Sequence, residues 1–187
     1  KEFINFVEEV SQLSLAVSGK MEDILQSEMK NKKNVKDNLV GLVSKIGEKI
    51  TLRRSAFIGN DKFLNFSYTH AAIKKNIGKL GVLLSIDTTK AKKDIINLGK
   101  QLAMQVASSS PLAIEKEGLD PNILKKEKEI ITEELKNSGK DSKILDKIAI
   151  GKLNKFIAEN TLLNQEWIME PKKKVSDIIK GISGKDK

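Results

Sequence analysis

The chain contains no cysteine and a single histidine, His70, among its 187 residues. Without cysteine the protein has no disulfide scaffold, thiolate metal site or cysteine nucleophile, and we expect it to work in a reducing compartment, the cytoplasm. A single histidine excludes histidine-rich zinc sites and argues against a Ser-His-Asp triad. We therefore expect no bound metal ion and no cofactor.

Long apolar runs and arginine are also scarce. The longest apolar stretch, near Val82–Ile86, is far too short to cross a bilayer, and no signal peptide is visible, so no membrane partner is expected. Arg53 and Arg54 are the only arginines among 34 basic residues. Because proteins that read phosphates or bases favour the bidentate fork of arginine, this composition does not favour direct binding of nucleic acid. The first residue is Lys1 rather than methionine, and we expect the natural front end to be missing.

The chain does have ample apolar residues and an excess of positive charge. Apolar residues make up 39% of it, which is enough at this length for a packed core of one domain or two small lobes. The formal net charge is +9, and residues 50–100 alone carry +7. Such a concentrated basic segment favours an acidic partner surface that is reached by electrostatic steering.

Apolar spacing predicts helices towards both ends of the chain and strands in the middle. Apolar residues at intervals of three and four indicate helices over residues 2–17, 35–46, 90–109, 121–137 and 142–161, and a short one around 175–179. Gly47 is placed to end the second of these helices, and Asp120 with Pro121 is placed to begin the fourth. Segments 50–58, 63–68 and 80–86 are rich in strand formers, and their short connections predict a three-stranded antiparallel sheet.

Residues 121–161 are expected to form a helical hairpin hinged at residues 137–140. Its apolar residues form one thin stripe, which cannot enclose a core, so the hairpin should project from the body. The expected seam consists of Ile123, Leu124, Ile130, Ile131 and Leu135 against Ile144, Leu145, Ile148, Leu153, Phe156 and Ile157. The predicted fold class is α+β, with a small antiparallel three-stranded sheet flanked by helices and a projecting antiparallel helical hairpin.

The residues offer little for catalysis. The run Gly139-Lys140-Asp141-Ser142 is similar to a phosphate-binding loop, but Glu134 and Asp141 occupy the positions where that motif requires glycine and then Ser or Thr. The acidic residues of segment 121–137 lie among lysines and are typical of a solvated helix face. His70 follows a strand without an accompanying nucleophile or metal ligands. These observations favour an interaction protein over an enzyme.

Several stretches also carry ordered motifs. Residues 47–54 read G-E-K-I-T-L-R-R, residues 68–70 read Y-T-H and residues 78–84 read G-K-L-G-V-L-L. Residues 102–111 read L-A-M-Q-V-A-S-S-S-P, and residues 162–171 read L-L-N-Q-E-W-I-M-E-P. In this order the stretches resemble the family of translation elongation factor Ts. The departures include Lys49 where the family has Asn, and Glu166 and Trp167 where it has Pro and Phe.

The resemblance implies a guanine-nucleotide exchange factor that binds the GTPase elongation factor Tu in protein synthesis and promotes the release of GDP. It implies that the GTPase is contacted by His70, Leu80, Gly81, Met104 and Gln105, with Ser138, Gly139 and Lys140 at the hairpin tip as a second set. It also implies that a T-D-F-V segment, which in the family lies upstream of an aromatic like Phe3, is absent here.

The same resemblance suggests how the chain is organised. Residues 1–48 would be the helical remainder of a first core lobe, 49–120 an α+β second core lobe, 121–162 a helical hairpin or coiled coil, and 163–187 a tail with a short helix. Either a homodimer or a two-to-two complex with the GTPase is compatible with it.

Two functions of other classes stay open at this level. One is a basic RNA- or ribosome-binding module without exchange activity, which would use the segment of charge +7. The other is a homo-oligomeric structural protein in which the hairpin pairs with its twin.

Overall fold

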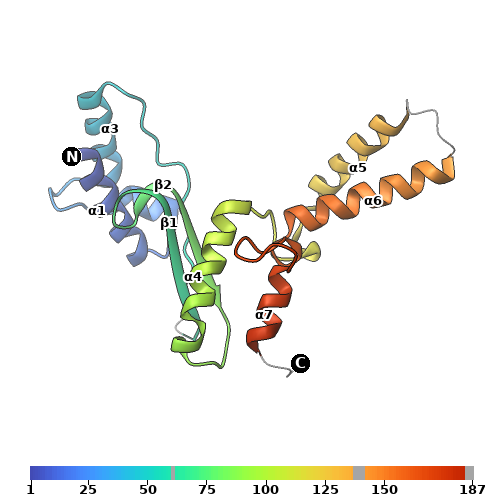
Figure 1. Cartoon of the computed structure of the whole chain (residues 1–187). Helices are drawn as coiled ribbons and strands as arrows, with labels where there is room; N and C mark the ends of the chain where they lie inside the picture. Colours follow the sequence, from blue (N-terminus) through green and yellow to red (C-terminus); the bar gives the residue numbers. More distant parts are fainter. Residues whose placement is uncertain (60–61, 137–141, 184–187) are drawn as a thin grey trace. The chain divides into compact units, whose positions relative to one another are not determined.

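The computed structural model describes residues 1–59, 62–136 and 142–183, which form an α+β structure (Figure 1). The elements are α1 (Glu2–Ala16), α2 (Met21–Gln26), α3 (Val35–Ile46), β1 (Leu64–Lys74), β2 (Ile77–Ile86), α4 (Lys92–Ser109), η1 (Lys116–Gly118), α5 (Pro121–Lys136), α6 (Ser142–Asn160), η2 (Leu162–Asn164) and α7 (Val175–Ser183). The longer helices predicted from apolar spacing are confirmed to within two residues at each end, and α7 extends beyond its predicted end.

The chain divides into two compact units, Lys1–Thr89 and Lys90–Lys187. The first unit holds α1 to α3 and the β-hairpin, and the second holds α4 to α7. The finer division into four segments at residues 48, 120 and 162 stays a prediction.

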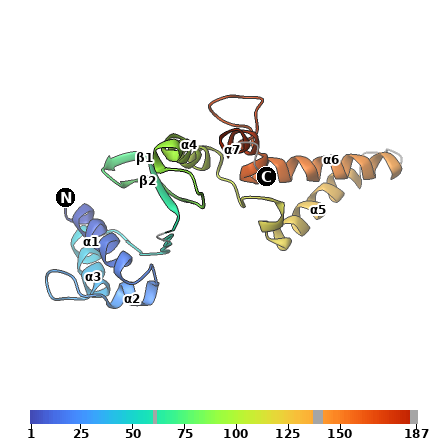
Figure 2. The same ribbon diagram turned by 90° about the horizontal axis from the view of Figure 1, so that it is seen from below.

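The first unit has a small helical core. Val10 of α1, Ile24 of α2, and Met29 and Val35 around the start of α3 are buried together, and the three helices lie beside one another (Figure 2). Gly47 ends α3 in the left-handed conformation, at φ 77°, as its position in the sequence predicts.

The two strands of the first unit form an antiparallel hairpin. Lys74 pairs with Ile77, so Lys75 and Asn76 alone connect the strands. Asn76 has a φ of 63°, which asparagine tolerates better than most residues. This tight turn explains why the strands extend beyond the predicted segments 63–68 and 80–86 towards each other. The register skips Ile73, which forms a bulge in β1.

The prediction of a third strand is wrong, because the sheet of the described residues has two strands and segment 50–58 has no strand structure. Leu52 instead packs against the helical core of the first unit. Phe57 lies so close to Gly19 that a Cβ at Gly19 would be 3.0 Å from the Cβ of Phe57. The segment therefore covers the helices, since strand formers pair only where an edge and favourable burial are available.

A glycine allows the strands of the hairpin to approach closely. Gly78 pairs with Ala72, and a Cβ at Gly78 would lie 2.5 Å from the carbonyl oxygen of His70 and 2.6 Å from Cγ2 of Thr69. Gly81, three residues along the same strand, has no heavy atom within 4 Å of its Cβ position. Only the first of these two glycines is required by the packing of the hairpin.

In the second unit, α4 contributes buried apolar residues, and the segments before α5 and after α6 pair with each other. Ile95, Leu98, Leu102 and Ala103 of α4 are buried. Segment 111–115 runs alongside the end of α6, where Ala113 and Thr161 form a parallel bridge. The backbone N–H of Leu162 donates to the carbonyl oxygen of Ala113 at 2.9 Å.

Helices α5 and α6 lie side by side (Figures 1 and 2), and an ion pair joins Glu134 of α5 to Lys152 of α6. Asp120 caps α5 by accepting the N–H of Asn122 at 2.8 Å, and Pro121 is the first helical residue, both as predicted. The hinge predicted at residues 137–140 lies outside the described residues.

The expected seam between α5 and α6 is correct only in part. Ile131 and Ile157 are buried, whereas Ile130 and Ile144 are about half exposed. Neighbouring helical residues point in directions about 100° apart, so Ile130 and Ile131 cannot both face the same neighbouring helix.

The two neighbouring isoleucines provide a matched test of this packing. We expect Ile131→Ala, which removes a side chain that is 3% exposed, to lower the free energy of unfolding by about 2–4 kcal/mol. Ile130→Ala, at 52% exposure, should lower it by about 0.5 kcal/mol or less. Urea unfolding followed by circular dichroism measures both. Equal losses would contradict the assignment of the buried face.

The two glycines of β2 provide a second matched pair. Gly78→Ala should destabilise the hairpin by about 1–3 kcal/mol, because the added methyl group must displace backbone atoms of β1. Gly81→Ala adds the same methyl group to open space and should leave the protection of the hairpin nearly unchanged. Hydrogen exchange of the β1 and β2 amides separates the two cases. Loss of protection in Gly81→Ala alone would show that the register is misassigned.

Candidate functional site

Three of the residues predicted to contact a partner lie together on the hairpin of the first unit. His70 of β1 and Leu80 of β2 are directly opposite each other in the register, so their side chains share one face of the sheet. Leu80 is an exposed apolar side chain, with 40% of its surface accessible. The pairing therefore presents an imidazole and an isobutyl group side by side to solvent.

The imidazole of His70 has a defined neighbour on its own strand. Its Nδ1 atom lies 3.2 Å from the hydroxyl oxygen of Tyr68, within hydrogen-bond distance, and the two ring centroids are 6.2 Å apart. Tyr68 pairs with Val82, which is buried, and so belongs to the inner part of the same face. The face that carries His70 and Leu80 thus consists mainly of apolar and aromatic side chains, which suits binding to a protein surface.

Gly81 lies on the opposite face of the hairpin, paired with Thr69. It lines a hollow of about 390 Å³ between that face and α1, to which α1 contributes residues such as Gln12 and Leu15. An ion pair with an N–O distance of 2.7 Å between Glu8 of α1 and Lys74 of β1 joins the same two elements. The absence of a side chain at Gly81 keeps this hollow open.

The other two described candidates, Met104 and Gln105, are on α4 in the second unit. Met104 is half-buried, whereas the side chain of Gln105 has no exposed surface. Gln105 therefore does not present its amide to a partner in this structure. The remaining candidates, Ser138, Gly139 and Lys140, lie outside the described residues.

The buried amide of Gln105 binds the backbone of the segment that follows η2. Its Nε2 donates to the carbonyl oxygen of Glu166 at 3.1 Å and to Oγ of Ser109 at 3.0 Å. Its Oε1 accepts the N–H of Ile168 at 2.9 Å. One side chain thus satisfies both a carbonyl and an N–H group of the same short segment.

Sequence reasoning did not select a second buried glutamine, Gln165. Its side-chain Nε2 donates to the carbonyl oxygen of Glu159 at 2.8 Å, and its backbone carbonyl oxygen accepts the N–H of Val175 at 3.0 Å. The only available signal was its position in the motif at residues 162–171, because a glutamine beside apolar residues does not reveal burial by itself.

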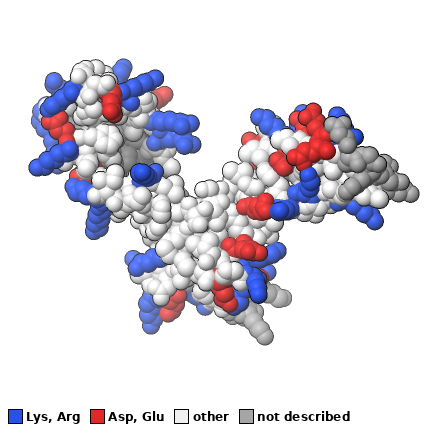
Figure 3. Space-filling model, turned by 45° about the horizontal axis from the view of Figure 1, so that its top comes forward, with Lys and Arg blue, Asp and Glu red and all other residues white. Residues whose placement is uncertain are grey.

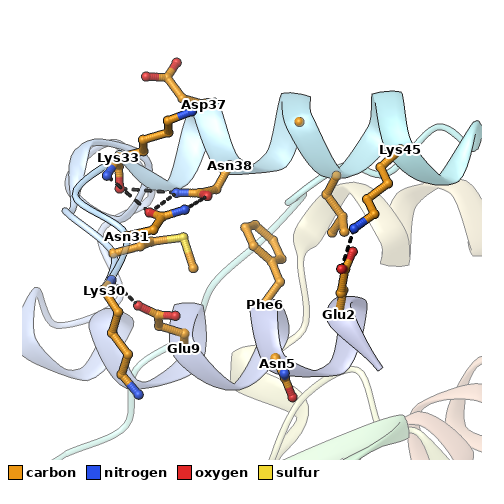
Figure 4. A pocket seen from close by; sticks show the side chains of 13 residues that line it. Glu2, Asn5, Phe6, Glu9, Lys30, Asn31, Lys33, Asp37, Asn38 and Lys45 are labelled. Atoms are coloured by element: carbon orange, nitrogen blue, oxygen red, sulfur yellow. Dashed lines mark hydrogen bonds and ion pairs between the residues drawn. The ribbon is translucent and has the colours of Figure 1, made fainter.

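Other surfaces of the described residues contain none of the predicted site residues. A hollow of about 420 Å³ lies between α1 and α3, with Phe6 pointing into it and the amides of Asn31 and Asn38 joined at one end (Figure 4). On the face seen in Figure 3, basic side chains outnumber acidic ones over the first unit, and a group of acidic side chains lies over α5 and α6 with basic ones beside it.

Searches for other kinds of site in the part of the chain that the structure describes gave negative results. No group of three or more His, Cys, Asp or Glu residues there is placed to hold a metal ion. None of the helices there has both the length and the apolar character needed to cross a membrane.

Comparison with known proteins identifies the family. The family model described as Elongation factor TS matches residues 1–185. The chain is 35% identical over 185 residues to elongation factor Ts of Nitrobacter hamburgensis, which covers 99% of this chain and 60% of that protein. It is 30% identical over 183 residues to elongation factor Ts of Gluconobacter oxydans, which covers 98% of this chain and 61% of that protein.

The chain thus spans about 60% of the length of these curated relatives. The ordered motifs, the α+β structure and the match of the family model over residues 1–185 lead to one conclusion. The chain belongs to the elongation factor Ts family.

Proposed function

We propose that this chain binds the GTPase elongation factor Tu and promotes the release of GDP during protein synthesis in the cytoplasm. The match of the family model over residues 1–185 is the observation that carries this proposal. The exposed pair of His70 and Leu80 supports it, because an ordered apolar group beside a polar ring suits a protein partner.

Exchange of this kind needs no catalytic residue in the chain. A protein that binds the nucleotide-free form of a GTPase more tightly than the GDP-bound form lowers the affinity for GDP by the same factor. The contact residues have only to recognise the nucleotide-free conformation. The function of the chain is therefore binding, and the chemistry of GTP hydrolysis stays with the GTPase.

Leu80 is the residue we expect to contribute most on the hairpin. Covering its remaining exposed surface should contribute about 1 kcal/mol, a share of the value for burying a whole leucine side chain. Gly81 leaves the hollow beside α1 free for a partner group, and Met104 offers a second contact on α4. We also propose that α5 and α6 form an antiparallel hairpin that projects from the second unit, and that Ser138, Gly139 and Lys140 are a second set of contact residues.

The coupling between nucleotide and exchange factor gives the most direct test. The chain should co-elute with elongation factor Tu in size-exclusion chromatography when Mg²⁺ is chelated, and adding GDP with Mg²⁺ should dissolve the complex. An affinity that GDP and Mg²⁺ leave unchanged would contradict the exchange function. A basic RNA- or ribosome-binding module would instead retain RNA and lose it steeply as the salt concentration rises.

Substitutions on the hairpin test the proposed surface. Leu80→Ser and His70→Ala should each weaken binding to nucleotide-free elongation factor Tu by about fivefold to tenfold, because each removes contact area from the face they share. Both side chains are exposed, so the thermal stability of the chain should change little. Val40→Ser, at an exposed apolar position on α3, serves as the control and should bind as the wild type does. Equal weakening by all three variants would argue against a local contact.

A further inference from the structure

The loop that follows η2 is a closed structure with a hydrogen-bonded base. Glu166 and Lys174 form an antiparallel bridge, and the N–H of Trp167 donates to the carbonyl oxygen of Lys173 at 2.8 Å. Within the loop, the N–H of Glu170 donates to the carbonyl oxygen of Trp167 at 3.1 Å. The indole of Trp167 is buried, so the loop of residues 166–174 (the 166–174 loop) is anchored at its base.

The outer part of the 166–174 loop presents apolar side chains. Ile168 is 39% exposed and Met169 is 44% exposed. The backbone N–H of Ile168, immediately before these exposed groups, donates to Oε1 of Gln105. The position of the exposed pair relative to α4 is therefore set by a side chain of α4.

Few side chains can replace Gln105 in this role. The buried segment requires a donor for the carbonyl oxygen of Glu166 and an acceptor for the N–H of Ile168, and a primary amide carries both. An apolar side chain of the same size would fill the volume but leave both backbone groups without a partner. A simple core position would not need a residue with these properties.

We propose that Gln105 is a positioning residue for partner binding, which holds the 166–174 loop against α4 so that Ile168 and Met169 can meet the GTPase. This inference rests on the proposed function, and it replaces a direct contact of Gln105 with an indirect one. Gln105 acts through the loop, and the half-buried Met104 beside it keeps its own place as a contact residue.

The test compares three variants of the whole chain by calorimetric titration against nucleotide-free elongation factor Tu. Gln105→Met has nearly the same volume but no amide, and we expect it to weaken binding about tenfold and to speed hydrogen exchange of the Ile168 amide. Gln105→His should recover most of the affinity, because a neutral imidazole has one donor and one acceptor. Leu98→Ala removes a buried side chain about two helical turns before Gln105 on the same helix, and should bind within about twofold of the wild type.

The outcomes separate this inference from the proposed function. A wild-type chain that does not bind elongation factor Tu overturns the proposed function and the positioning role with it. If the wild-type chain binds and Gln105→Met binds with the same affinity, the positioning role alone is overturned. The positioning role is also overturned if Leu98→Ala weakens binding as much as Gln105→Met does. The loss of affinity would then come from lower stability of the chain and not from release of the loop. Should Gln105→Met fail to fold, Met169→Ser, which removes an exposed apolar group of the same loop, should weaken binding, and an unchanged affinity would overturn the role of the loop.

Discussion

The second unit depends on hydrogen bonds that two glutamine side chains make to the backbone. A loop cannot be buried unless its N–H and carbonyl groups find partners, and here the carbonyl oxygen of Glu166 and the N–H of Ile168 bind a side chain. Gln105 binds both of these groups, and Gln165 donates to the carbonyl oxygens of Ser109 and Glu159. Every buried side-chain nitrogen and oxygen atom of the described residues has a hydrogen-bond partner, so this polar interior is fully satisfied.

The hairpin of the first unit obeys a different constraint, which is steric. Its strands approach closely at Gly78, and the turn at Lys75 and Asn76 is as short as an antiparallel pair allows. These features set the register, and the register places His70 opposite Leu80. The proposed contact surface is thus a consequence of a glycine and an asparagine that need not contact the partner themselves.

Among the described residues, neither unit has a group of three or more His, Cys, Asp or Glu placed to hold a metal ion. The proposed contact groups are exposed apolar side chains on hydrogen-bonded backbone: Leu80 on a paired strand, and Ile168 and Met169 on the 166–174 loop. A contact group that is already held in its bound conformation loses less conformational entropy on association. The same contact area then contributes more to affinity than it would on a flexible segment. This suits a protein whose proposed effect is to favour one conformation of its partner.

The sequence alone determined the helices, because apolar spacing and caps such as Gly47 and Asp120 are local signals. It also indicated the family, through motifs read in order, and that resemblance named His70, Leu80 and Gly81 as candidate contacts. It could not decide between strand and coil for residues 50–58, because Leu52 packs on helices that are distant in the chain. Nor could it tell Ile130 from Ile131, or show that Gln105 faces inward. Only the tertiary structure decided those points, since burial of a side chain depends on which distant segment covers it.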